Sequence, residues 1–142
     1  MNQASFFPLL TNLLGLVSKS FPQYLRYSRP YVPAHREHVM DALEGIAADQ
    51  DVLADRLGLI IADAGVPLRT GEFPMEYTDT HDLNIDFLLR LAVDSQHQDI
   101  AAIEQLVEQL TPFTVAKSLA EEALGMAKGH LESLEELISQ PV

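Results

Sequence analysis

Cysteine is absent from the 142 residues of this chain. Its absence excludes disulfide bonds, thiolate metal ligands and cysteine nucleophiles, and it is compatible with a reducing cytosol. Positive charge is also scarce, because nine lysines and arginines stand against 21 aspartates and glutamates, for a net charge of −12. Surfaces that bind nucleic acid or anionic lipid are basic, so we expect neither nucleic-acid nor membrane binding.

The sequence also has no hydrophobic run long enough to span a bilayer, which takes about 20 apolar residues. Its most apolar stretch, MNQASFFPLLTNLLGLVSKS, is interrupted by Pro8, Thr11 and Asn12. The stretch lacks both the basic segment and the cleavage motif of a signal peptide. We therefore expect a buried helix in a soluble, cytoplasmic protein.

Strands are not indicated, because no stretch alternates between apolar and polar residues with a period of two. The second segment instead repeats every four and three positions, with Gln50 as its only clearly polar member: Val39, Leu43, Ile46, Gln50, Leu53, Leu57, Ile60 and Ala64. The chain length and the hydrophobic fraction of 47% suit one domain over residues 1–142. The sequence therefore predicts a single all-α domain.

Four helices account for the periodic segments. The first covers about residues 4–28, and Pro22 should kink or divide it. The second has Pro33 in its first turn and ends near Gly65, because proline suits helix starts and glycine suits helix ends.

The other two helices are placed by their start signals. The third begins where Asp79 or Thr80 can cap it, and Asp82 then complements the dipole of its first turn. The fourth begins at Thr111 as N-cap, with Pro112 at the first helical position.

The lengths of the connections predict how the helices run. SRPYVP and LTPF are short, which favours antiparallel neighbours. The link VPLRTGEFPMEYTDT has about 15 residues and can cover about 50 Å, whereas the second helix is roughly 46 Å long. This link can therefore run the full length of the bundle, so helices two and three should be parallel and joined by one long crossover.

Several fragments resemble a subunit of the ferritin-like superfamily, of the bacterioferritin type or the Dps type. They are LTNLLG and QYL in the first helix, ADRL and AGVPL at the end of the second, LAVD in the third, and GHLESLEELI in the fourth. They occur in the family's order over nearly the whole chain. The resemblance implies a ferritin-like four-helix bundle with one long crossover, and a homo-oligomer of two or more subunits.

The resemblance also implies where a di-iron centre would lie. The family uses a Glu from each of two helices and a Glu-x-x-His from each of the other two. By position, these ligands fall at Val17, Gln50, Leu53, Asp94, Ala127 and His130. Valine, leucine and alanine have no donor atom, and a neutral glutamine is a poor ligand for a hard metal. The resemblance thus implies the fold together with a degraded di-iron motif.

Six consecutive polar residues, DSQHQD from Asp94 to Asp99, interrupt the third helix at its midpoint. In one interpretation, Asp94, His97 and His130 bind a single Fe or Zn ion, and Gln50 supports a ligand through a hydrogen bond. In the other interpretation, these side chains pair with one another in a polar layer inside the bundle.

A second group of histidines precedes and begins the parallel helices. His35, His38 and Asp41 lie at the start of the second helix, and His81 and Asp82 at the start of the third. Parallel helices would place both groups at the same end of the bundle. They are interpreted either as a metal site or as solvated residues at helix starts.

Two functions follow from these patterns. The first is a structural, assembly or partner-binding protein without a competent di-iron site. The alternative is a metal-binding oxidase or iron-handling protein that keeps a reduced site for Fe or Zn at Asp94, His97 and His130.

Overall fold

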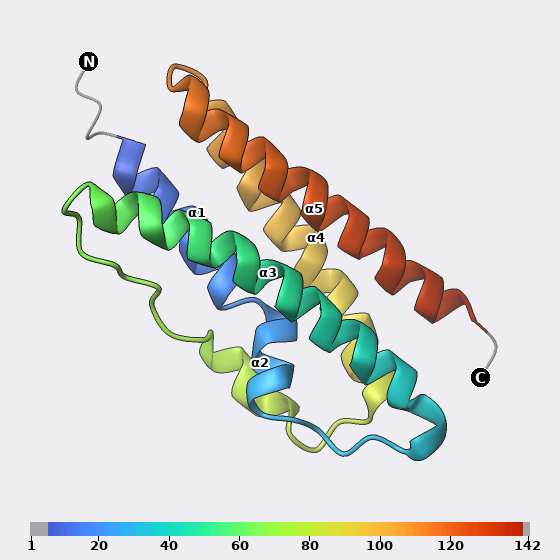
Figure 1. Cartoon of the computed structure of the whole chain (residues 1–142). Coiled ribbons are helices and arrows are strands. Elements are labelled where there is room, and N and C mark those ends of the chain that lie inside the picture. Colours follow the sequence, from blue (N-terminus) through green and yellow to red (C-terminus); the bar gives the residue numbers. More distant parts are fainter. Residues whose placement is uncertain (1–5, 141–142) are drawn as a thin grey trace.

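The computed structural model describes residues 6–140. Within this range helices are the only regular secondary structure, which confirms the all-α prediction. The elements, shown in Figure 1, are α1 (Phe7–Ser18), α2 (Phe21–Tyr27), η2 (Ala34–Arg36), α3 (Glu37–Asp63), η3 (Met75–Thr80), α4 (Ile85–Gln109) and α5 (Thr114–Ser139).

The first predicted helix is divided into α1 and α2, as Pro22 suggested. The break falls at Lys19 and Ser20, and Pro22 lies in the first turn of α2, where its missing N–H costs no helical hydrogen bond. The Ser20 hydroxyl caps α2 by accepting a hydrogen bond from the Gln23 N–H over 3.4 Å. Residues 4 and 5 of the predicted helix lie outside the described residues.

The predicted start of α4 was wrong. The helix begins at Ile85, and the Asn84 side chain caps it by accepting from the Phe87 N–H over 2.9 Å. Thr80 belongs to η3 and donates its hydroxyl to the Tyr77 carbonyl, so Asp86 rather than Asp82 is the acidic residue of the first turn. Asn84 prevails because it directly precedes Ile85, the first residue that α4 buries.

The predicted start of α5 was wrong as well. Thr111 and Pro112 lie in the turn between α4 and α5, and α5 begins at Thr114 with Phe113 at its N-cap position. The Thr111 hydroxyl contacts the Val107 carbonyl, 3.3 Å away, and so completes the end of α4.

The α-helices pack in two groups along one long axis. α1 and α2 lie along α3, and α4 lies along α5. The connection 64–84 leaves the end of α3 and returns along the molecule to the start of α4, as Figure 1 shows. α3 and α4 consequently point in the same direction, and α1 and α5 point the opposite way.

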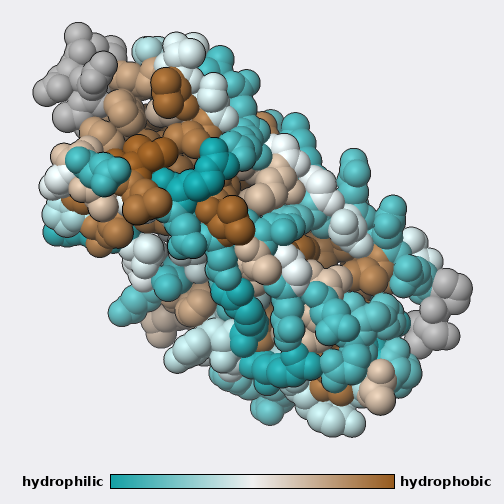
Figure 2. All heavy atoms as spheres, viewed as in Figure 1, coloured by the Kyte–Doolittle hydropathy of each residue, from teal (hydrophilic) through white to brown (hydrophobic). Residues whose placement is uncertain are grey.

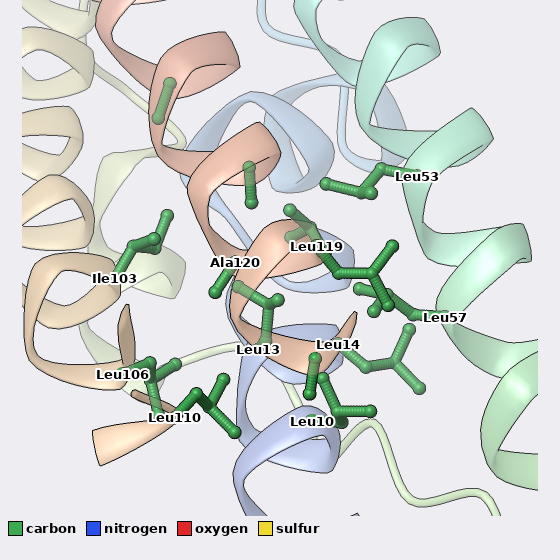
Figure 3. Close-up of a cluster of buried hydrophobic side chains, with 14 of the residues drawn as sticks. Leu10, Leu13, Leu14, Leu53, Leu57, Ile103, Leu106, Leu110, Leu119 and Ala120 are labelled. Atoms are coloured by element: carbon green, nitrogen blue, oxygen red, sulfur yellow. The ribbon is translucent and has the colours of Figure 1, made fainter. Parts of the chain in front are cut away.

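The buried apolar side chains form two clusters. One unites α1 with the later halves of α3 and α4 and the first half of α5; Figure 3 shows Leu13, Leu57, Ile103 and Leu119 meeting there. The other gathers around α2 and the earlier halves of α3 and α4. Each cluster excludes water from one end of the molecule.

Candidate functional site

A layer of buried polar side chains separates the two apolar clusters. On each long helix the polar residue falls in the interval between the last residue of one cluster and the first of the other. The members of this layer are Ser20, Gln23, Gln50, Gln96 and His130. Buried polar groups must be hydrogen-bonded, so the partners of each one decide what the layer can do.

Gln50 pairs with the start of α2. The Ser20 hydroxyl donates to the Gln50 Oε1 over 2.7 Å. Beside it, Gln23 donates from Nε2 to the Ala47 carbonyl over 3.0 Å and to Asp51 over 3.1 Å. These bonds fasten α2 to α3 and use the side-chain oxygen of Gln50 in a contact within the protein.

Gln96 joins α4 to α5 in the same layer. Its Nε2 donates to the main-chain carbonyl of Ala127 over 2.9 Å. Ala127 stands where the ferritin-like resemblance implies a glutamate, and its methyl group leaves the backbone within reach of the amide. The small side chain therefore leaves room for an interhelical hydrogen bond.

His130 is buried in the layer but contacts α3. Its Nε2 lies 2.9 Å from the Asp49 Oδ2, whose side chain is exposed. Its Nδ1 is buried and has no hydrogen-bond partner among the described residues. The buried position follows the helical pattern of α5, whereas Asp49 is 81 residues away in sequence and carried no signal of this pairing.

The structure does not bring the predicted metal ligands together. Asp94 and His97 are exposed on α4, while His130 faces Asp49. Within residues 6–140, no three histidine, aspartate or glutamate side chains form a group that could hold a metal ion. Gln50 likewise bonds to Ser20 rather than to any of these residues.

The side chains of the six-residue polar run of α4 lie in three different environments. Gln96 points inward to α5, and Asp94, His97 and Gln98 are exposed. Ser95 and Asp99, four residues apart on one face, are half-buried against the returning connection. This division explains why the helix interrupts its apolar pattern over a whole turn and a half.

Asp99 lies between two cavities that sequence reasoning missed. A cavity of about 510 Å³ opens toward α1 and residues 69–72, and one of about 410 Å³ opens toward η3 and the middle of α4. Asp99, Tyr77 and Pro74 line both. The Tyr77 hydroxyl lies 3.4 Å from the Ser95 Oγ.

Burial changes the acid–base chemistry of the side chains that line both cavities. It raises the pKa of Asp99 to about 7, because the charged carboxylate is poorly solvated there. It also raises the pKa of Tyr77, and the Asp99 charge adds to that shift. A carboxyl that titrates near neutrality can hold or release a proton in the cavity. No local pattern indicates this, because Tyr77 approaches from a separate segment.

The second histidine group is only partly assembled. His35 and His81 line one cavity of about 410 Å³ together with Arg36, whereas His38 and Asp41 are exposed and lie outside it. His81 is held by the Tyr24 hydroxyl, 2.9 Å from its Nε2. The two histidines thus line the same cavity at the end where α3 and α4 both begin.

The comparisons with protein-family models, curated proteins and solved structures find no match to this chain. In the part of the chain that the structure describes, no helix combines the length and the apolar character that crossing a membrane requires.

Proposed function

We propose that this protein is a ferritin-like helical bundle without a di-iron centre, which acts in the cytoplasm by assembling with itself and binding a protein partner. The course of the chain supports this proposal. α3 and α4 point the same way and are joined by the long connection 64–84, and the sequence fragments that resemble the family lie in its order.

One observation supports the proposal that the chain has no di-iron centre. Val17, Leu53 and Ala127 take three of the six positions where ligands would be needed, and they are 4%, 3% and 6% exposed within one apolar cluster. A di-iron centre needs carboxylates and imidazoles in that place, and a charge put among these leucines would be strongly destabilised. In this chain, buried apolar side chains occupy three of the positions at which the resemblance implies iron ligands.

An apolar surface supports a role in assembly. Val52, Leu59 and Leu68 are large, apolar and exposed near the later half of α3. Figure 2 shows hydrophobic side chains gathered on this part of the molecule, at the upper left. Leu59 and Leu68 also line a groove of about 530 Å³ whose floor includes the small residues Ala54 and Gly58. Large apolar side chains that are exposed around a groove are a feature of protein–protein contact sites.

The absence of a metal centre is tested by purifying the chain without chelator or affinity-tag metal and measuring bound metals by elemental mass spectrometry. The measurement is repeated after aerobic addition of Fe(II). We expect less than stoichiometric Fe and Zn, and Fe(II) oxidation no faster than in buffer, because the described residues contain no cluster of ligands.

A double substitution, His97→Leu with His130→Leu, is the matched control. Near-stoichiometric Fe or Zn that disappears in this variant would contradict the proposal and establish the alternative function, a metal-binding oxidase or iron-handling protein. Metal that remains in the variant would place a metal site elsewhere and would also contradict it.

A further inference from the structure

A cavity of about 410 Å³ lies between η3 and the middle of α4. η3, which lies beside α2 in Figure 1, contributes Tyr77 to one side of it. α4 contributes Leu91, Ser95 and Asp99 to the other side, and their spacing of four places them on one face of the helix. Cavities of this size between packed elements are common binding sites for small molecules.

Part of the wall is apolar and aromatic. The rings of Phe21 and Tyr77 both line the cavity, with their centroids 4.9 Å apart. Pro74 and Leu91 add aliphatic surface. Side chains of this kind contact hydrocarbon favourably, so the wall suits a ligand with an apolar body.

Asp99 is the half-buried acceptor of the same wall. Burial raises its pKa to about 7, and within residues 6–140 no hydrogen bond or neighbouring charge offsets that shift. The unpartnered side-chain atoms that are closed off from solvent in this range are Arg36 Nε and His130 Nδ1, and the Asp99 oxygens are not among them. A poorly solvated but accessible carboxylate without a donor favours a ligand that supplies one.

The charges around the cavity favour a cation. Of the described residues that line it, Glu76, Asp94 and Asp99 are acidic, and none is a lysine, arginine or histidine. Lys19 and Arg69 line the neighbouring cavity with Asp99, but neither forms an ion pair with it within the described range. A positive charge bound here therefore meets attraction without a competing basic side chain.

A metal ion does not suit this wall. No three histidine, aspartate or glutamate side chains within residues 6–140 form a group that could hold one. Hard metal ions need several oxygens that converge on one point. An ammonium group carries its own donors and needs only one well-placed carboxylate, which Asp99 provides.

We propose that this cavity binds a small organic amine in its ammonium form. The ammonium donates hydrogen bonds to the Asp99 carboxylate and the Ser95 hydroxyl, which lie on one face of α4. The apolar body of the amine contacts Phe21, Tyr77 and Leu91. No residue of this site belongs to the polar layer or to the groove on α3, so the inference goes beyond the proposed role in assembly.

The test uses two probes that share a ring and differ in charge. The full chain, labelled with ¹⁵N, is titrated at pH 7.5 and constant ionic strength with benzylamine hydrochloride and, separately, with benzyl alcohol. At this pH most of the Asp99 side chains are ionised. We expect saturable amide shifts with benzylamine at residues 74–80 and 91–99, and at least tenfold weaker binding of benzyl alcohol.

Three results of this titration would overturn the proposal. They are shifts with benzylamine that are absent or do not saturate, shifts centred on other residues, and binding of benzyl alcohol as tight as that of benzylamine.

Asp99→Asn keeps the shape of the side chain and removes its charge. We expect benzylamine to bind about tenfold more weakly, the loss of roughly one charge-assisted hydrogen bond. The matched control is Glu104→Gln, which makes the same change of charge at an exposed position of α4 outside this cavity, and it should bind as the wild type does. Unchanged affinity in Asp99→Asn, or an equal loss in both variants, would overturn the proposal.

Circular dichroism shows whether Asp99→Asn is folded. Should it fail to fold, Ser95→Ala takes its place, because it removes the second acceptor of the site and leaves Asp99 intact. We expect about threefold weaker binding of benzylamine, the share of one neutral hydrogen bond. Affinity equal to that of Glu104→Gln would then overturn the proposal.

Discussion

At the scale of single residues, Asp99 is the side chain whose chemistry departs furthest from the ordinary. Its pKa is raised from 3.8 to about 7 by burial. The folded state therefore holds a proton that the unfolded state releases above about pH 4. Between about pH 4 and pH 7 the free energy of unfolding falls as pH rises, and above pH 7 the whole penalty of the buried charge is present.

Asp99→Asn should remove this penalty. We expect the free energy of unfolding to rise by about 1–2 kcal/mol at pH 8.5 and to change little at pH 4, where Asp99 is largely protonated in the folded state. The full shift would give about 4 kcal/mol, but partial exposure of the side chain reduces it. Urea denaturation at the two pH values measures the difference.

Asp94→Asn provides the comparison for this experiment. Asp94 lies on the same helix and is exposed, so its substitution removes the same formal charge without relieving burial. It should leave the pH dependence of unfolding close to that of the wild type. An Asp99→Asn profile parallel to that of Asp94→Asn would show that burial of Asp99 does not control stability.

The sequence predicts which residues are buried wherever helical periodicity decides it. The apolar seams of α3 and α5 place Gln50 and His130 inside, and both are buried. The partners were not predictable, because Asp49 meets His130 and Ser20 meets Gln50 across pairs of helices. Periodicity gives the face of a helix that is buried, whereas a hydrogen bond depends on which neighbour that face meets.

At the scale of elements, the break between α1 and α2 is held by Ser20. Its hydroxyl caps α2 and also donates to the buried Gln50. Ser20→Ala should lower the free energy of unfolding by about 2 kcal/mol, because a cap is worth about 1 kcal/mol and the Gln50 oxygen is left buried without a donor. Urea denaturation measures this loss.

Asn84→Ala separates the two contributions. Asn84 caps α4 from an exposed position, so its loss should cost about 1 kcal/mol and leave no buried acceptor. The double variant Ser20→Ala with Gln50→Leu should recover part of the stability, since both polar groups are removed together. Equal losses in Ser20→Ala and Asn84→Ala would show that the pairing with Gln50 contributes nothing.

Element boundaries were less predictable than element types. The stretch TDTHDLNID contains several residues that can cap a helix, and the local signals of Asp79, Thr80 and Asn84 are comparable. Packing chooses among them, because Ile85 is the first residue of α4 that the core buries. The same holds for Thr111, whose hydroxyl completes the end of α4 rather than beginning α5.

At the scale of the whole molecule, we predict a dimer that uses the later half of α3. Light scattering coupled to size-exclusion chromatography should give twice the chain mass of 15.7 kDa. Leu59→Glu should shift the protein to monomer, because it puts a charge into the centre of the exposed apolar patch.

Val115→Glu serves as the control for this variant. Val115 is also apolar and exposed, but it lies at the start of α5 and is not part of the groove on α3. It should leave the mass unchanged. A wild-type chain that elutes as a monomer, or a Leu59→Glu variant that remains a dimer, would exclude this interface.

The long link was expected to be able to run the full length of the bundle and so to make α3 and α4 parallel. Two short turns and one long link led to parallel α3 and α4, and the connection 64–84 does return along the molecule. The cavities beside that connection were not predictable, because they depend on where η3 lies against α4. Chain length limits how far a segment reaches but not the surface on which it settles.

The polar layer also bears on how the molecule opens. The break at Ser20 coincides with the layer, so α1 contributes to one apolar cluster and α2 to the other. Hydrogen bonds of modest net strength connect the two ends there, while each cluster has its own buried leucines. We therefore expect the amides of α2 to exchange their hydrogens before those of α1, so that the molecule opens from one end.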